Sequence, residues 1–451
     1  MAEGEKYTVD VLNSGLEVWL SIYDSEGITL DDIKGKLEAQ GIVYGIKDDL
    51  INKLVTDNFP VGQYIIAEGT QPINGEDSKV ECLVEMAKPL TAENIGSKYF
   101  HIKITNVRKG QRLLRIIPAT EGTPGYNVFG EEKLHANGKT LASPRGANTG
   151  YLEEEPNYLV ALKAGNFVYD PTQVRVESEY KIVGDLSTVN GKDVECYGDL
   201  IVQGDVKVGV TLKVDGNLTI TGSVEDANIE CAGNIDIKSG IRGSGLCKIT
   251  AYGDVAFFHG NNYNITTRAS VKVGKIAMNC NITAKYIDSP RAALCGGKLI
   301  AYTYIEVLDL GKEEFKRTTI ELAGKVIKLR INGEIDKEID ELSDKVKLCK
   351  DKVAHFKRVT ANKTLSREQD EGIYTFSHPL DLLSEILEKR IKEKGRLQDD
   401  MRKMAPKVIV NGFVYDNVRL TINNVNIQNL DKARNVTYYE KDGEIITVRN
   451  N

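Results

Sequence analysis

The sequence has no long hydrophobic run. No stretch of about 18 consecutive apolar residues occurs. The first residues, Met-Ala-Glu-Gly-Glu-Lys, have neither the basic nor the apolar segment of a secretion signal. We therefore expect a cytoplasmic protein without a membrane span. The seven cysteines are widely spaced and include no Cys-x-x-Cys pair, which favours reduced, mostly buried thiols over disulfides.

An excess of one charge is also missing. The 451 residues include 59 Lys+Arg and 65 Asp+Glu, for a net charge of −6. This mildly acidic balance argues against a generally basic nucleic-acid-binding protein, although a local basic patch could be hidden in the sum. The length is sufficient for several packed units.

Proline is scarce, with 11 residues against 41 glycines, and none lies between Pro171 and Pro290. Such a stretch suggests many turns joined by strands whose backbone N–H groups are all needed. Within it, the chain repeats a glycine, then Asp, Asn or Lys, then alternating apolar residues. The repeats begin at Gly198, Gly216, Gly233, Gly253, Gly274 and Gly297. A period of about 20 residues predicts a parallel β-helix over residues 180–311.

A finer spacing runs through the first coils. Leu200, Val206, Leu212, Leu218 and Val224 lie six residues apart, which is the spacing of left-handed hexapeptide solenoids. The register then slips, and later coils lengthen unequally. Because the corners of a right-handed β-helix tolerate insertions, we favour the right-handed form and keep the left-handed form as the alternative.

Two regions of mixed character precede the repeat. Residues 1–88 combine strand-like and helical segments, one of which starts at Thr29 as N-cap, and predict a small α+β domain. Residues 89–179 contain short alternating runs and predict a small all-β unit. We expect this unit to dock on the first solenoid coil and cover its open edge.

The composition changes abruptly after Leu310. Residues 312–407 carry 23 basic and 19 acidic side chains. Apolar residues at steps of four and three form one heptad seam, through Ile335, Ile339, Leu342, Val346, Cys349, Val353 and Phe356. A second seam runs through Ile373, Phe376, Leu380, Leu383, Leu387, Leu397, Met401 and Met404. Two such seams predict an antiparallel coiled-coil hairpin over residues 312–406.

The hairpin is expected to be an insertion. Its arms would meet at a break over 360–366, where Ser366 and Gln369 fit a capping box. Residues 407–451 return to alternating strands and are predicted to complete or cap the β-helix. The coiled coil would then project sideways from between two coils.

Two basic residues, Arg390 and Lys394, interrupt the second seam. They either snorkel where the helices splay, or set the register or bind a partner. Together with Lys392 and Arg396 they form a basic cluster, but Glu388 and Glu393 are interleaved. A solvated helix face is therefore favoured over a nucleic-acid patch.

No motif for catalysis, cofactor binding or metal binding is complete. Gly138-Lys139-Thr140 resembles the end of a phosphate loop, but Lys133 stands where the loop needs its first glycine. Ser244 lacks the first glycine of a nucleophile elbow. The histidines are scattered singly, which argues against a zinc site; they are His101, His135, His259, His355 and His378. We predict no site residues and no cofactor.

Acidic residues recur at the predicted corners: Asp185, Asp199, Asp205 and Asp254. A carboxylate column would resemble the sites of carbohydrate-cleaving β-helices. Other residue types, however, occupy equivalent corners, namely Asn217, Asn234, Lys275 and Lys298. This mixture is what a turn preference would produce, and we favour that explanation.

Several segments, in order, suggest a family. They are residues 41–46, 66–75, 122–130, Gly138-Lys139, the Gly-Asp/Asn coils with 222–229, and the charged hairpin with its returning strands. In this order they resemble the bacterial flagellar assembly protein A family along nearly the whole chain. The resemblance implies a right-handed β-helix similar to those of polymer-forming cytoskeletal proteins, an N-terminal α+β domain and a protruding coiled coil. It also implies a role in flagellar or cell-pole organisation, without a known catalytic residue.

We therefore expect a non-enzymatic scaffold or assembly protein. It would bind protein partners through the β-helix and the hairpin, and it would self-associate. Two alternatives stay open: a carbohydrate-active β-helix enzyme that uses turn carboxylates, and nucleic-acid binding through the hairpin.

Overall fold

The computed structural model describes residues 6–85, 104–153, 155–170, 172–323, 325–359, 367–403 and 405–450. The chain forms two compact units, and neither is continuous in sequence. The first contains Met1–Leu83, Leu114–Ser143 and Tyr151–Leu159, and the second contains Val84–Leu113, Pro144–Gly150 and Val160–Asn451. The expected boundary at 88/89 lies outside the described residues, and the segment 89–179 contributes to both units instead of forming one of its own.

The first unit begins with a small α+β arrangement. Strands β1 (Tyr7–Leu12), β2 (Glu17–Ile22) and β3 (Gly62–Glu68) form an antiparallel sheet in that order. Helices α1 (Leu30–Ala39) and α2 (Asp48–Thr56) share its apolar core. Thr29 caps α1 as predicted, because its hydroxyl accepts a hydrogen bond from the Asp32 amide and the Asp32 carboxylate accepts one from the Thr29 amide.

Three extended segments, 69–78, 118–127 and 132–141, continue the first unit. The Gly75 amide donates to the Ala136 carbonyl, and the Gly138 amide donates to the Thr120 carbonyl. A side chain at Gly138 would place its Cβ 1.9 Å from the carbonyl oxygen of Glu76, and one at Gly75 would place it 2.0 Å from that of Thr120. Gly138 therefore permits close backbone packing. Its surroundings are not those of a phosphate loop.

Short strands accompany these segments and lead into the second unit. They are β4 (Lys79–Cys82), β5 (Asn106–Val107), β6 (Arg112–Ile117), β7 (Gly125–Tyr126), β8 (Glu132–Lys133), β9 (Thr149–Leu152), β10 (Glu155–Ala161), β11 (Gly165–Val168) and β12 (Arg175–Glu177). Within the second unit, the Asn106 side chain donates to the Glu195 carbonyl and accepts from the Tyr197 amide. The segment around β5 thus lies against the first coil of the solenoid.

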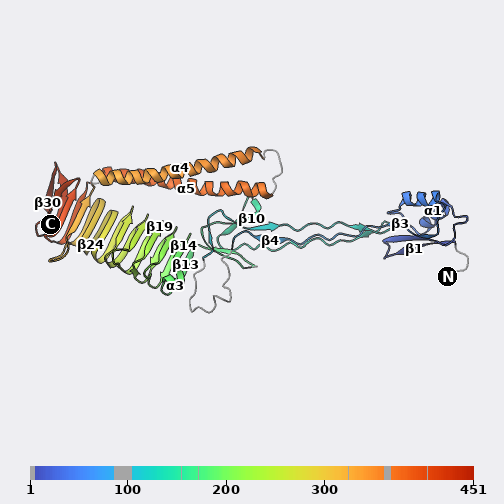
Figure 1. The fold of residues 1–451 in the computed structure, drawn as a ribbon, viewed down its shortest axis with the longest axis horizontal. Helices are drawn as coiled ribbons and strands as arrows, with labels where there is room; N and C mark the ends of the chain where they lie inside the picture. Colours follow the sequence, from blue (N-terminus) through green and yellow to red (C-terminus); the bar gives the residue numbers. More distant parts are fainter. Residues whose placement is uncertain are drawn as a thin grey trace. The chain divides into compact units, whose positions relative to one another are not determined.

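A parallel β-solenoid forms most of the second unit (Figure 1). One stack contains β13 (Glu179–Val183), β15 (Asp199–Gln203), β17 (Leu218–Ile220), β20 (Ile235–Arg242) and β22 (Val255–Asn261). A second contains β14 (Asp193–Cys196), β16 (Thr211–Val214), β19 (Asn228–Cys231), β21 (Lys248–Ala251) and β23 (Asn264–Thr267). A third is marked by parallel bridges from Leu186 to Val206 and from Val206 to Val224, at β18 (Val224–Glu225); the short helix α3 (Thr188–Gly191) lies at the first coil.

The six-residue spacing reflects these three stacks. Leu200 and Leu218 are paired in the first stack, Leu212 lies in the second, and Val206 and Val224 lie in the third. All five side chains are fully buried. The parallel β-helix predicted from the sequence is confirmed, while its hand stays a prediction.

The glycine repeat loses the register after Gly253. The residue that pairs with Val255 is Val271, and the corner after Asp254 is Ser270. Gly274 was expected at a corner, but it lies directly after the paired strand residues 271–273. The reason is that Ala269 and Ser270 replace the usual glycine and acid or amide, so glycine spacing no longer marks the coil.

A ladder of side chains joins the corners. The side-chain oxygen at each corner accepts the backbone N–H of the next corner, from Asn217 to Asp199 (2.7 Å), Asn234 to Asn217 (3.0 Å), Asp254 to Asn234 (2.8 Å) and Ser270 to Asp254 (3.0 Å). A second ladder links Asp185, Asp205 and Ser223. Burial alone would raise the pKa of Asp254, but the hydrogen bonds from Ser270 and the nearby Lys272 bring it below its ordinary value.

Later coils are formed by β24 (Ser270–Leu310), β25 (Thr318–Leu322), β26 (Lys407–Val414) and β27 (Val418–Ile422). The antiparallel strands β28 (Val425–Ile427), β29 (Ala433–Lys441) and β30 (Glu444–Arg449) follow them. Helices α4 (Lys325–Val359) and α5 (Arg367–Lys403) stand between β25 and β26. The predicted insertion is thus confirmed, because β26 pairs with β24 and β27 pairs with β25.

The start of the insertion differs from the prediction. Residues 318–322 were expected in the hairpin, but they form β25 and pair in parallel with 297–301. Their alternation of apolar side chains was masked by the surrounding charges. The capping box at Ser366 lies outside the described residues, as do the side chain of Met401 and all of Met404.

We expect removal of a corner carboxylate to destabilise the solenoid. Asp254→Ala leaves the amide of Ser270, a buried residue, without its acceptor, which should lower the free energy of unfolding by about 1–3 kcal/mol. Asp254→Asn keeps an acceptor like that of Asn234 and should cost less than about 1 kcal/mol. Denaturant unfolding of both variants measures the difference. Equal losses in the two variants would contradict a hydrogen-bonding role.

Candidate functional site

Helices α4 and α5 pack as an antiparallel pair. We call the end of the pair where α4 begins and α5 ends its base. Near the base, Asp336 of α4 forms an ion pair with Lys394 of α5. Near the other end, the rings of Phe356 and Phe376 are stacked with centroids 6.1 Å apart. The described seam residues are buried or half-buried on both helices, as the heptad pattern predicts.

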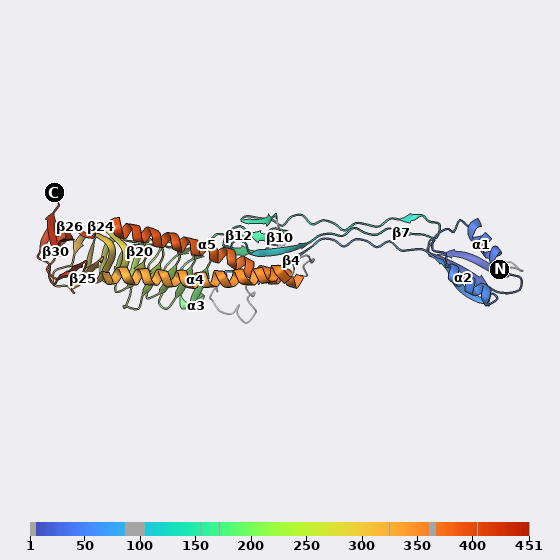
Figure 2. The same ribbon diagram turned by 90° about the horizontal axis from the view of Figure 1, so that it is seen from above.

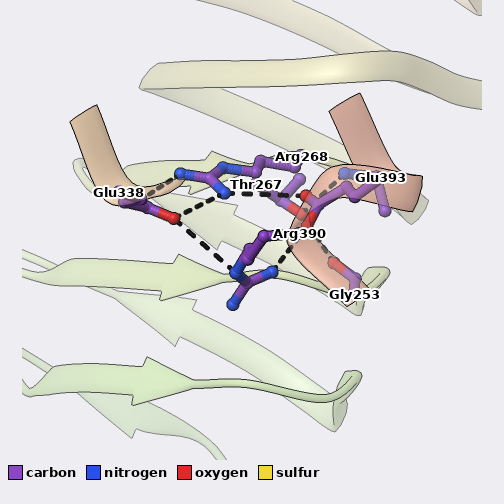
Figure 3. A network of polar contacts seen from close by, with 7 residues as sticks. Gly253, Thr267, Arg268, Glu338, Arg390 and Glu393 are labelled. Carbon is purple, nitrogen blue, oxygen red and sulfur yellow. Dashed lines mark hydrogen bonds and ion pairs between the residues drawn. The ribbon is translucent and has the colours of Figure 1, made fainter. Parts of the chain in front are cut away.

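Four charged side chains form a closed ring at the base of the helix pair (Figure 3). The guanidinium of Arg268, from the solenoid, contacts Glu338 of α4 at 3.0 Å and Glu393 of α5 at 3.7 Å. The guanidinium of Arg390 contacts the same two carboxylates at 3.6 and 2.5 Å. Only 16% and 18% of the two arginine side chains are exposed. Each charge therefore has two opposite partners in a largely desolvated place.

Aromatic and apolar contacts complete this anchor. The guanidinium carbon of Arg390 lies 3.9 Å from the centre of the Tyr252 ring, and that of Arg268 lies 4.9 Å from it. The hydroxyl of Thr267 donates to the Gly253 carbonyl and accepts from the Ala269 amide. These bonds fix the corner that carries Arg268.

A small apolar cluster lies beside the ring. It joins the buried side chains of Tyr302, Ile335 and Leu397. Tyr302 comes from the solenoid, Ile335 from α4 and Leu397 from α5. The solenoid and both helices therefore pack together at this cluster.

The other end of α5 is also attached within the second unit. The Arg112 guanidinium pairs with Asp370 at 2.8 Å, and the Arg112 amide donates to the Tyr374 hydroxyl at 2.7 Å. The His378 ring nitrogen Nε2 lies 2.9 Å from the Lys109 carbonyl oxygen. With α5 attached at both ends, the helix pair runs alongside the stacked strands (Figure 1 and Figure 2). The expectation that the hairpin projects sideways is wrong.

The two basic residues in the seam explain this arrangement. Arg390 is one of the four residues of the charged ring and lies over the Tyr252 ring. Lys394 joins the two helices through its ion pair with Asp336. Of the two interpretations weighed for these residues, the register device fits these contacts. The sequence could indicate that a seam was interrupted, but not that Arg268 and Glu338 would meet the interruption.

The residues considered for chemistry do not come together. The Ser244 amide donates to Asp226 at a corner, and the corner carboxylates accept backbone amides. His101 lies outside the described residues. Among the residues that the structure describes, no three His, Cys, Asp or Glu side chains could hold a metal ion. Six of the seven cysteines are buried, and burial raises the pKa of Cys231 to about 11 and that of Cys280 to about 12.

One surface was missed in the sequence. Between residues 345 and 358, α4 exposes six basic side chains, which are spread around the solvent-exposed side of the helix and which we together call the basic α4 face: Lys345, Lys347, Lys350, Lys352, Lys357 and Arg358. Asp351 is the one acidic residue within this stretch, and it is exposed as well. Counting charge over the whole hairpin, or over all of α4, hides this local excess, because acidic residues outnumber basic ones in residues 325–344; counting over residues 345–358 alone would have found it.

The fold defines the class of protein: a parallel β-solenoid with an inserted helix pair fixed along it. Residues 178–445 match the model of the flagellar assembly protein A β-solenoid domain, and residues 8–172 match the model of the N-terminal region of the same protein. The chain therefore belongs to the flagellar assembly protein A family, as the sequence resemblance indicated. No curated protein and no solved structure matches it significantly. Among the described helices, none has the length and hydropathy needed to cross a bilayer.

We expect Arg390→Ala to loosen the base of the helix pair. The substitution leaves Glu338 and Glu393 with one guanidinium between them and removes the closest cation from Tyr252. Local opening should become easier by about 1–3 kcal/mol, measured as faster amide hydrogen exchange in 333–342 and 389–397. Lys337→Ala is the control, because Lys337 is 79% exposed and should change exchange little. Equal exchange in wild type and Arg390→Ala would contradict an anchoring role.

Proposed function

We propose that this protein is a non-enzymatic assembly scaffold that binds an acidic protein partner through the basic α4 face. The observation that carries the proposal is the cluster of six exposed basic residues on α4, which is anchored at Glu338 and packs along α5, a helix attached at both ends. A fixed helix presents these charges in one arrangement, so little order has to be imposed when a partner binds. Long-range attraction would also speed the encounter.

The family supports an assembly role. Its description names flagellar assembly and no reaction. The corner carboxylates, which the carbohydrate-enzyme alternative requires, each accept a backbone amide of the next coil. We therefore propose organisation of the flagellum or the cell pole in the cytoplasm as the setting of this scaffold, and we do not favour the enzyme.

Self-association is a further part of the proposal. The order of strands ends at β30, which has β29 as its hydrogen-bonded neighbour. The outer edge of such a strand can pair with a second chain. A scaffold that self-associates would present several basic α4 faces to one partner assembly.

Charge reversal on α4 tests the proposal. We expect Lys345→Glu combined with Lys352→Glu to weaken capture of acidic partner proteins at least tenfold, because two attractive contacts become repulsive. The partners would be captured from lysate of the source organism, identified by mass spectrometry and re-measured in purified form. Lys181→Glu combined with Lys213→Glu is the matched control, since both side chains are exposed on the solenoid. A similar loss in both variants would contradict binding at α4.

Nucleic-acid binding through the same face is the second candidate, because clustered lysines also attract phosphates. Gel shifts with duplex DNA at about 0.05 and 0.2 M salt distinguish the two. We expect no shift at the higher salt. A salt-steep shift that disappears in the α4 variant would instead favour nucleic acid.

A further inference from the structure

A cavity lies between α5 and the corners of the solenoid, beside the charged ring. Its volume is about 420 Å³. The solenoid wall includes Tyr252, Arg268 and Lys285, and the helix wall includes Lys389, Lys392 and Arg396. The cavity is thus bounded by two elements that belong to the same unit.

The sequence places these side chains regularly. Residues 389, 392 and 396 are spaced by three and four, so they share one helix face. On the other wall, the Lys285 amide donates to the Ala269 carbonyl of the preceding coil, which places Lys285 one coil beyond Arg268. Five basic side chains therefore converge on one space.

Acidic groups contact several of these side chains. Among the described residues of the lining, Glu393 is the acidic one, and the ring already engages it with Arg268 and Arg390. Glu385 pairs with Lys389 at 2.9 Å and Glu388 with Lys392 at 3.8 Å, but both carboxylates are more than half exposed and lie outside the lining. Such surface pairs are weak and exchange readily for a stronger anion.

We propose that this cavity binds a small phosphate compound with at least two negative charges, such as a diphosphate. Guanidinium and ammonium donors on two walls suit several phosphate oxygens at once. The volume lies within the range of small-molecule sites and exceeds what a single inorganic anion needs. Tyr252, Ala269 and Leu397 add apolar surface for an organic part.

Such a ligand would bridge α5 and the solenoid. It would bind the closed arrangement of the helix pair better than an opened one, and so would stabilise the closed arrangement. This inference does not depend on partner binding, because the basic α4 face is on the other helix.

Calorimetric titration of the full chain tests the site. Pyrophosphate and ADP are added at constant ionic strength, with sulfate as the comparison anion. We expect saturable binding of both phosphate compounds with a Kd below about 1 mM, at least tenfold tighter than that of sulfate. Binding should also slow amide hydrogen exchange in 389–397.

Paired variants locate the site. Lys392→Gln combined with Arg396→Gln should weaken binding at least tenfold. Lys337→Gln combined with Lys213→Gln removes the same charge away from the cavity and should leave the Kd unchanged. Circular dichroism verifies that both variants are folded. Absence of saturable binding, equal affinity for sulfate, or equal weakening in both variants would overturn the proposal.

Discussion

The structure depends on hydrogen bonding from one coil to the next. Parallel strands satisfy their backbone groups only through neighbouring coils, and the corner residues extend this pairing through the turns. Asp199, Asn217, Asn234 and Asp254 perform the same task with either a carboxylate or an amide oxygen, which explains why both residue types occur at corners. The inward Leu, Val and Ile side chains then fill a continuous core whose stability adds up coil by coil.

The rest of the second unit is attached to this rigid core at specific points. The hydrogen bonds of the Thr267 hydroxyl fix the corner that carries Arg268. The Arg268 guanidinium forms ion pairs with Glu338 of α4 and Glu393 of α5. At the far end, the Arg112 guanidinium pairs with Asp370, and the Arg112 amide donates to the Tyr374 hydroxyl. Charged pairs of this kind contribute more to specificity than to net stability, because desolvation offsets much of the attraction. They select one placement of α5 among the many that its seam would allow.

Local periodicity explains what could be predicted from the sequence. The inward column from Leu200 to Val224, the two heptad seams and the Thr29 cap all depend on residues close in sequence, and each is present in the described part of the chain. The contact of Arg112 with Asp370 joins residues 258 positions apart, and no periodicity encodes it. The three extended segments of the first unit were not predicted for a related reason. Gly75 and Gly138 pack against the backbone of segments that are distant in sequence, and no periodic pattern indicates such contacts. Strand β25 was missed because its flanking charges resemble those of the helices.

The double attachment of α5 links the length of the helix pair to the length of the solenoid. One anchor lies at a solenoid corner and the other at the segment before the first coil, so the distance between them is set by the number of coils. Adding a heptad to each helix would lengthen the pair by about 10 Å, whereas one more coil adds about 4.8 Å. A longer member of this architecture would therefore keep both anchors only if it gained about two coils for every heptad in each arm.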